Sequence, residues 1–131
     1  MKRILIVDDK ATSRELFRTV LERQGYAVTE AANGKEALEK VRAQAPDLIL
    51  LDLQMPIRNG YEVLGELRQD AAYATLPIIA LTASAMQGDR EKALAAGFTG
   101  YLAKPVTLSH LREEIQRLFD PGNAVKAGGT L

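Results

Sequence analysis

The stretch LILLDLQMP at residues 48–56 gives the clearest indication of the fold, because an apolar run typical of a strand is followed by a carboxylate. Four leucine and isoleucine residues in a row are typical of a strand buried on both faces, as in the middle of a parallel sheet. A carboxylate at such a place, here Asp52, does not stabilise the fold, because burying an unpaired charge is costly. The acid therefore marks either the point where the strand leaves the core or a functional group.

Four further short apolar runs flank this strand along the chain: ILIV at 4–7, AVTEA at 27–31, IIAL at 78–81 and GYLA at 100–103. Between the runs, apolar residues return every three or four positions, which is typical of helices. Five repeated strand–helix units predict an α/β fold with a parallel sheet covered on both faces. Because 27–31 alternates and contains Glu30, it is expected at an edge. The predicted fold is a doubly wound (βα)5 domain with strand order 2-1-3-4-5.

Helix boundaries are predicted from capping pairs and glycines. Three pairs place a capping side chain three residues before a glutamate: Thr12 with Glu15, Asn33 with Glu36, and Asn59 with Glu62. Gly25 and Gly97 are expected to follow helix ends. The helix near 88–97 carries few large apolar residues and is expected to pack weakly. In the last helix, a solvated charged face is expected for Arg112, Glu113, Glu114 and Arg117. We expect one domain over 1–120 and a flexible tail or linker stub over 121–131.

Composition argues against several classes of function. The 17 basic and 17 acidic residues balance, so direct nucleic-acid binding is disfavoured. The apolar runs are too short for membrane insertion. The chain has no cysteine for a thiolate site, and its one histidine, His110, is interpreted as a surface or capping side chain. The expected location is the cytoplasm.

Polar side chains follow the strands at the edge where the carboxyl ends of a parallel sheet meet. Asp8 and Asp9 follow the first strand, Asp52 the third, Thr82 the fourth and Lys104 the fifth. Each alone has a structural explanation, such as a cap or a solvated charge. Three converging carboxylates, however, need positive charge among them. Because all the ligands offered are oxygen atoms, Mg²⁺ is the expected cofactor.

Magnesium in turn implies phosphate chemistry. Ionised Asp52 can attack phosphorus and form an acyl phosphate, a known route of covalent catalysis. Lys104 and the Thr82 hydroxyl can then bind phosphoryl oxygens. Such a transfer needs mainly alignment and charge neutralisation, so no histidine base is required.

The span from Lys2 to about Phe119 resembles the receiver domain of two-component response regulators, which have a flavodoxin-like or CheY-like fold. Five motifs carry the resemblance, in the order and spacing of that family: VDD ending at Asp9, DLQMP beginning at Asp52, NG at 59–60, LTA around Thr82, and YLAKP at 101–105.

The resemblance implies a role for each matching residue. Asp52 is the expected phosphoacceptor, and Thr82, the Ala83 amide and Lys104 are expected to hold the phosphoryl group. The implied metal ligands are Asp9 and Asp52 directly, Asp8 through water, and the backbone carbonyl of Gln54. Thr82 and Tyr101 form the expected switch, and the peptide bond before Pro105 is expected to be cis.

The implied function is a phosphorylation-dependent signalling switch and not a turnover enzyme. A histidine kinase or histidine phosphotransfer protein would donate the phosphoryl group. The domain would phosphorylate itself from that donor, with possible weak autodephosphorylation. An unknown downstream protein would bind the surface of the fourth helix, fifth strand and fifth helix.

Alternatives and departures from the family pattern remain. A metal-dependent phosphohydrolase with an aspartyl-phosphate intermediate would usually have a second carboxylate where Gln54 stands. A flavin carrier of the same topology is disfavoured by the acidic DDKATS loop. A degenerate receiver that only binds partners is disfavoured because all five rim residues are retained, namely Asp8, Asp9, Asp52, Thr82 and Lys104. Arg58 and Asn59 replace a hydrophobic and acidic pair, while Gln54 and Ser84 leave the acyl-phosphate lifetime open. A stand-alone regulator and an excised receiver of a larger protein are equally compatible with the sequence.

Overall fold

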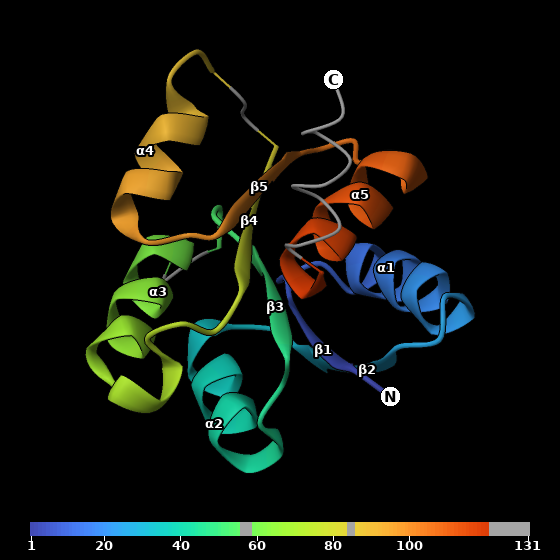
Figure 1. Ribbon diagram of the computed structural model, residues 1–131, viewed down its shortest axis with the longest axis horizontal. Helices are drawn as coiled ribbons and strands as arrows, with labels where there is room; N and C mark the ends of the chain where they lie inside the picture. Colours follow the sequence, from blue (N-terminus) through green and yellow to red (C-terminus); the bar gives the residue numbers. More distant parts are fainter. Residues whose placement is uncertain (56–58, 84–85, 121–131) are drawn as a thin grey trace.

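The computed structural model describes residues 1–55, 59–83 and 86–120. Within these residues, five parallel strands form one sheet in the order β2-β1-β3-β4-β5 (Figure 1). The strands are β1 (Arg3–Val7), β2 (Ala27–Ala31), β3 (Leu48–Asp52), β4 (Ile78–Thr82) and β5 (Gly100–Ala103). The predicted fold and strand order are confirmed, including the edge position of β2.

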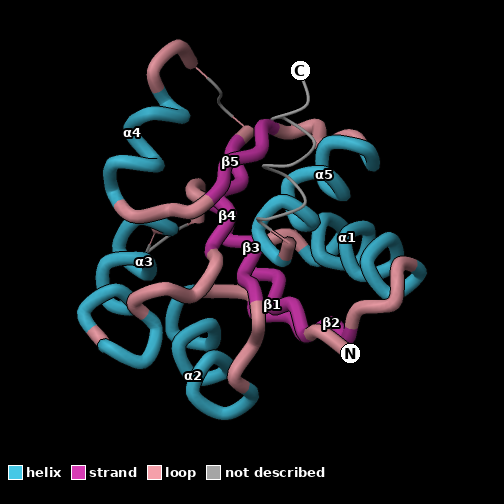
Figure 2. The backbone as a smooth tube through the Cα atoms, in the orientation of Figure 1, coloured by secondary structure: helices cyan, strands magenta, loops and turns pink. Residues whose placement is uncertain are grey.

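Helices cover both faces of this sheet, as the crossover rule requires. The helices are α1 (Ala11–Arg23), α2 (Gly34–Gln44), α3 (Gly60–Gln69), α4 (Asp89–Ala96) and α5 (Leu108–Phe119), with a short 3₁₀ turn at Ala71–Tyr73. One face carries α1 and α5, and the other carries α2, α3 and α4 (Figure 2). None of the helices described is long and apolar enough to cross a membrane.

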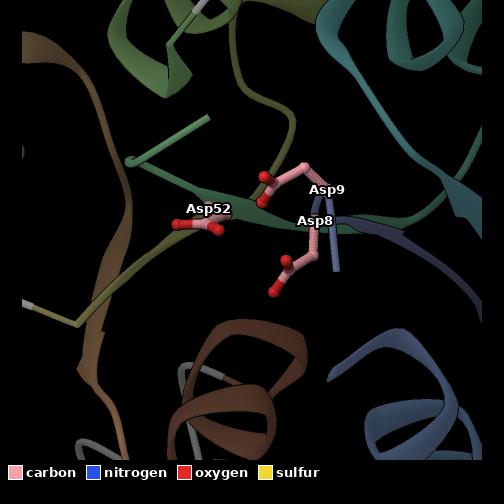
Figure 3. Close-up of side chains that lie close together, drawn as sticks. All are labelled: Asp8, Asp9 and Asp52. Atoms are coloured by element: carbon pink, nitrogen blue, oxygen red, sulfur yellow. The ribbon is translucent and has the colours of Figure 1, made fainter. Parts of the chain in front are cut away.

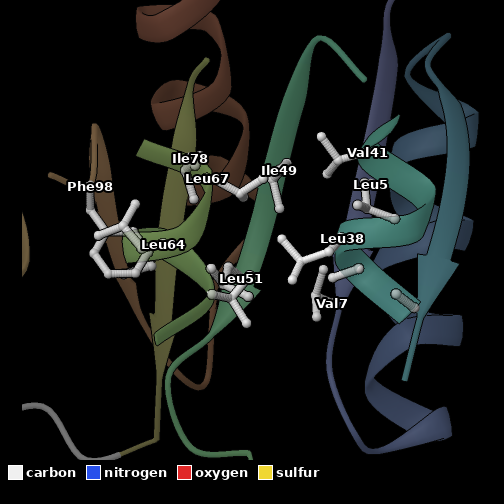
Figure 4. Close-up of a cluster of buried hydrophobic side chains, with 14 of the residues drawn as sticks. Leu5, Val7, Leu38, Val41, Ile49, Leu51, Leu64, Leu67, Ile78 and Phe98 are labelled. Carbon is white, nitrogen blue, oxygen red and sulfur yellow. The ribbon is translucent and has the colours of Figure 1, made fainter. Parts of the chain in front are cut away.

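The core lies in two layers because successive side chains of each strand point to opposite faces. In β3, Ile49 and Leu51 pack toward α2 and α3 (Figure 4), whereas Leu48 and Leu50 pack toward α1 and α5. All four are at most 1% exposed. Each such burial contributes about 1.5–3 kcal/mol before entropy is counted. The central strand is thus anchored from both sides, and its carboxyl end is held in register with its neighbours.

The strand ends lie one residue beyond the predicted ends in two places. Asp52 and Thr82 are the last residues of β3 and β4, where the sequence placed them just after the strands. In register, Val7 pairs with Leu51, and Asp52 pairs with Leu81. Both polar residues are therefore held by the sheet itself and not by a loop.

Two of the three predicted helix caps are present. Asn59 forms a full capping box with Glu62, with side-chain to backbone distances of 3.0 and 3.1 Å, and Asn33 accepts a hydrogen bond from Glu36 N–H. The predicted cap at Thr12 is wrong. Helix α1 begins at Ala11, and its N-cap is Lys10, which makes no side-chain cap.

The helix ends agree with the glycine positions. Gly25 and Gly97 both have positive φ, at +95° and +120°; Gly25 lies two residues after the end of α1, and Gly97 directly follows α4. Such a backbone is costly for residues with a Cβ. The last helix ends at Phe119 as predicted, and the predicted tail at 121–131 lies outside the described residues.

The charged face predicted on the last helix is only partly solvated. Arg112 and Glu113 are exposed, but the Glu114 side chain is 11% exposed. Glu114 accepts hydrogen bonds from Tyr101 N–H at 3.0 Å and from Arg117 Nε at 2.7 Å. The prediction was wrong for Glu114 because β5 is an edge strand, and its unpaired N–H needs an acceptor from α5.

Candidate functional site

Three carboxylates gather at the carboxyl ends of β1 and β3 (Figure 3). Oxygen atoms of Asp8, Asp9 and Asp52 all lie within 4.8 Å of one another. Asp8 is fully buried and Asp52 is 3% exposed, whereas Asp9 faces solvent. Two buried acids beside a third make an electronegative cluster that requires positive charge nearby.

Backbone amides orient the two buried acids. Lys10 N–H donates to Asp8 Oδ1, and Gln54 N–H donates to Asp52 Oδ1, each at 2.9 Å. In both cases the amide lies two residues after the acid, so a local turn sets the side-chain direction. The guanidinium of Arg14 donates to the backbone carbonyl of Asp8 at 2.6 Å, which ties the end of β1 to α1.

The close approach of α3 completes the wall behind Asp52. A Cβ at Gly60 would lie 2.6 Å from the backbone carbonyl oxygen of Asp52. No side chain fits at that distance, so the first residue of α3 has to be glycine for the helix to start against the end of β3.

Lys104 supplies positive charge to the acidic cluster. Its Nζ lies 2.8 Å from Asp8 Oδ2 and 3.6 Å from Asp52 Oδ2. The backbone N–H of Lys104 donates to the backbone carbonyl of Thr82 at 2.7 Å. Burial lowers the pKa of Lys104, but the hydrogen bond to Asp8 and the charges of Asp52 and Asp8 outweigh it and raise the pKa overall. The ammonium is therefore kept charged. The Lys104–Pro105 peptide bond is cis.

Asp52 sits in a less balanced environment. Burial raises the pKa of Asp52, and the hydrogen bond from Gln54 N–H and the charge of Lys104 lower it only in part, so the pKa lies above its ordinary value. Asp8 and Asp9 raise it further. One ammonium for three carboxylates leaves room for more positive charge, and a cation would favour the ionised form of Asp52.

The chemistry of this cluster fits a hard divalent cation. Its donors are carboxylate oxygens from two strand ends, with no imidazole or thiolate among them. Such a donor set is typical of Mg²⁺, which binds one or two carboxylates and keeps places for water and substrate oxygens. Exposed Asp9 leaves one side of the cluster open to solvent.

Thr82 and Ala83, the other two predicted phosphoryl-binding residues, meet the side chain of Gln54. Gln54 Nε2 donates to Thr82 Oγ1 at 2.7 Å, and Ala83 N–H donates to Gln54 Oε1 at 2.9 Å. Thr82 is 1% exposed at the end of β4. The Gln54 amide therefore bridges the ends of β3 and β4, directly beside Asp52.

Tyr101 lies half-buried on β5, between α4 and α5. Its ring packs against the core layer on the side of α3 and α4. The hydroxyl is buried and has no hydrogen-bond partner among the residues that the structure describes. Burial raises the pKa of Tyr101, and the charge of Asp89 adds to the effect. The ring thus occupies a place that suits the aromatic part better than the hydroxyl.

The structure brings together the five predicted rim residues Asp8, Asp9, Asp52, Thr82 and Lys104, and the Ala83 amide lies beside them. Asn59, one of the departures from the family pattern, caps α3. Arg58 and Ser84 lie outside the described residues, as does Pro56.

Three side chains at or near the site escape sequence reasoning. These are the Arg14 guanidinium, the Gln54 amide and the Glu114 carboxylate. The partner of Arg14 lies 6 residues away along the chain, the two partners of Gln54 lie 28 and 29 residues away, and the β5 partner of Glu114 lies 13 residues away. Local patterns carry no sign of such pairs. For Gln54, only the position two residues after Asp52 hinted at a role.

Comparisons with known proteins agree with this geometry. The family model described as response regulator receiver domain matches residues 4–116. Over 115 residues the chain is 39% identical to the polar-differentiation response regulator DivK of Brucella anthropi, which covers 88% of this chain and 94% of that protein.

Solved structures give the same result. The chemotaxis response regulator CheY4 of Vibrio cholerae matches with a TM-score of 0.84 and 34% identity, over 90% of this chain and 98% of that one. The signal receiver domain of a signal transduction histidine kinase from Syntrophus aciditrophicus matches with a TM-score of 0.83 and 31% identity, over 92% of each chain.

Proposed function

Because this chain belongs to the family of response regulator receiver domains, we propose that Asp52 is the phosphoacceptor of a phosphorylation-dependent signalling switch. Receiver domains are regulatory and not metabolic enzymes. The observation that carries the proposal is the place of Asp52, buried at a strand end among two other acids, with Lys104 Nζ at 3.6 Å. The cytoplasmic location expected from the sequence remains part of the proposal.

The proposed reaction is an in-line phosphoryl transfer. An Asp52 carboxylate oxygen forms a bond to phosphorus while the bond from phosphorus to the donor nitrogen breaks, and that nitrogen keeps the electron pair and takes up a proton. The donor would be the phosphohistidine of a histidine kinase or of a histidine phosphotransfer protein. The domain would thus phosphorylate itself from the donor, and weak autodephosphorylation by water would reverse the state.

Residues of the rim have separate roles in this step. Lys104 would turn its ammonium from the acids to a phosphoryl oxygen, and Thr82 and the Ala83 amide would bind others. Asp9 and Asp52 would hold Mg²⁺ directly, Asp8 through water, and the Gln54 carbonyl would be a further ligand. Bound Mg²⁺ would supply positive charge that offsets the carboxylates and the incoming phosphoryl group.

The output of the switch would be the surface formed by α4, β5 and α5. Movement of Thr82 toward the phosphoryl group would open space for the Tyr101 ring, whose hydroxyl is buried without a partner among the described residues. A downstream protein would read the changed surface. To shift such an equilibrium from one to ninety-nine percent, phosphorylation has to favour the active state by about 5.5 kcal/mol.

The alternatives considered from the sequence are less well supported. A phosphohydrolase would use an acid or base two residues after the nucleophile, and the neutral amide of Gln54 cannot act as either. A degenerate receiver would lack part of the rim, yet the acids and Lys104 lie together here.

The test is phosphorylation by a small donor. We expect wild-type protein incubated with phosphoramidate and Mg²⁺ to gain a single phosphoryl adduct by intact mass, and EDTA to prevent it. Asp52→Asn should gain none, because an amide is a poor nucleophile for phosphorus. Asp120→Asn, an exposed control, should react like wild type. An unmodified wild type, or an adduct that survives in Asp52→Asn, would contradict the assignment.

A further inference from the structure

The side chain of Gln54 is hydrogen-bonded to two of the groups that are expected to bind the phosphoryl group. Ala83 N–H, one of the expected phosphoryl-binding groups, already donates to Gln54 Oε1 at 2.9 Å. Thr82 Oγ1, another, accepts from Gln54 Nε2 at 2.7 Å. The amide of Gln54 thus stands across the end of β4, next to the phosphoacceptor.

A carbonyl oxygen and a phosphoryl oxygen compete for the same kind of partner. The Ala83 N–H is a single donor, and a second acceptor can use it well only by displacing the first. The Thr82 hydroxyl is engaged through its oxygen by an NH₂ group that faces the site. Gln54 Oε1 therefore holds the place that a phosphoryl oxygen on Asp52 would take.

We propose that the Gln54 side chain acts as a latch in the unphosphorylated protein: it occupies the Ala83 N–H, holds Thr82 through its Oγ1, and has to swing away before Asp52 can be modified. This inference rests on the function proposed above and deepens it. Gln54 is a positioning residue in this scheme, since it acts on Thr82 and Ala83 and takes no part in bond making. The bond from phosphorus to the donor nitrogen still breaks as the bond to Asp52 forms.

The surroundings of Gln54 allow such a movement. The residue is exposed, so its side chain can leave without opening the core. A pocket of about 220 Å³ lies beside it, lined by Leu53, Gln54, Asn59, Tyr61, Thr82, Asp89 and Lys92. This pocket offers polar groups of Asn59, Asp89 and Lys92 to the displaced amide. The Gln54 backbone can stay in place while the side chain moves, because Gln54 N–H is hydrogen-bonded to Asp52 Oδ1.

The latch also bears on the switch. While Gln54 Nε2 is bound to Thr82 Oγ1, the Thr82 side chain is held at the mouth of the site and has one more contact to break before it can turn. A phosphoryl oxygen is charged and forms stronger hydrogen bonds than an amide oxygen. The phosphoryl group should therefore displace the Gln54 amide, but phosphorylation should be slower than if the Ala83 N–H were open.

The first experiment compares rates of phosphorylation. Gln54→Met has a side chain of similar length with neither amide group, and Gln69→Met, at the exposed end of α3, is the matched control. With phosphoramidate and Mg²⁺, we expect Gln54→Met to form the adduct about fivefold faster than wild type, the factor that one net hydrogen bond represents. Gln69→Met should keep the wild-type rate.

The second experiment detects the latch without any phosphoryl donor. Ala83 lies at the surface, and the acceptor of its N–H is Gln54 Oε1. Amide hydrogen exchange by NMR should therefore show a protected Ala83 amide in wild type and in Gln69→Met, and about fivefold faster exchange in Gln54→Met.

The outcomes separate the two proposals. An adduct that forms in wild type and Gln54→Met at equal rates, or more slowly in Gln54→Met, overturns the latch and leaves the proposed function intact. An Ala83 amide that exchanges equally fast in both proteins overturns the latch as well. Absence of an adduct from every variant overturns the proposed function and the latch together.

Discussion

Helices α4 and α5 flank the same edge strand, β5, but the fold holds them differently. Helix α5 buries Leu111 and Ile115 and begins with a side-chain cap from Thr107. Helix α4 is shorter, buries only Ala93 and has no side-chain cap, in line with the weak packing predicted from its sequence. Apolar burial and capping supply most of the stability of a surface helix. In the surface formed by α4, β5 and α5, we therefore expect α5 to stay fixed and α4 to move.

Tyr101 belongs to both sides of that comparison. Its backbone N–H is bound to Glu114 of α5, while its ring lies toward α4 with a buried hydroxyl. A switch at this residue can therefore move a ring and a loosely packed helix while the strand stays in place.

Truncation of the core should separate the two helices most clearly. Ile115→Ala removes a fully buried side chain and should lower the free energy of unfolding by about 2–5 kcal/mol. Leu94→Ala, at a position of α4 that is 39% exposed, should cost about 0.5 kcal/mol or less. Urea unfolding followed by circular dichroism measures both. Equal losses would remove the basis of the comparison.

Removal of the Glu114 carboxylate should have the next largest effect on stability. Glu114→Ala leaves Tyr101 N–H without its acceptor and should cost about 1–3 kcal/mol of stability. Glu114→Gln keeps an acceptor oxygen and should cost less, and exposed Glu113→Ala should have little effect. Thermal and urea unfolding of the three variants would test this. A wild-type stability in Glu114→Ala would show that α5 is not tied to β5 through this side chain.

Local opening should follow the same order. We expect backbone amides in the middle of α4 to exchange at least about tenfold faster than those in the middle of α5, because fewer buried contacts have to break. Native-state hydrogen exchange measured by NMR gives both sets of rates in one sample. Slower exchange in α4 than in α5 would contradict the assignment of α4 as the movable helix.

Removal of the Tyr101 hydroxyl should have the smallest effect. Tyr101→Phe should raise the free energy of unfolding by up to about 1 kcal/mol, because the buried hydroxyl has no partner among the described residues and so gains nothing from folding. Because burial raises the pKa of Tyr101, the folded state keeps its proton when the unfolded chain loses it. The stability that this difference in pKa contributes is fully present below pH 10.0, the ordinary tyrosine pKa, and is lost as the pH rises above it. The stability of Tyr101→Phe should therefore fall less than that of wild type over this pH range. Marked destabilisation at neutral pH would mean that the hydroxyl has a partner.

Much of the fold follows from short patterns. The continuous apolar run at 48–51 predicted a central strand, and the alternation around Glu30 predicted an edge. The capping pairs at Asn33 and Asn59 also hold, because a cap needs only residues three apart. The pair at Thr12 failed because the turn made by Asp8 and Lys10 lets α1 start at Ala11.

The positions of the polar residues after the apolar runs are enough to predict which residues reach the rim, because the carboxyl ends of all strands in a parallel sheet lie at the same edge. How these residues pair depends on the folded structure. The Lys104 ammonium lies between Asp8 and Asp52, Gln54 covers Thr82 and Ala83, and Glu114 holds β5. Strand periodicity is local and can be read along the chain, whereas these contacts depend on how helices and loops distant in sequence pack together.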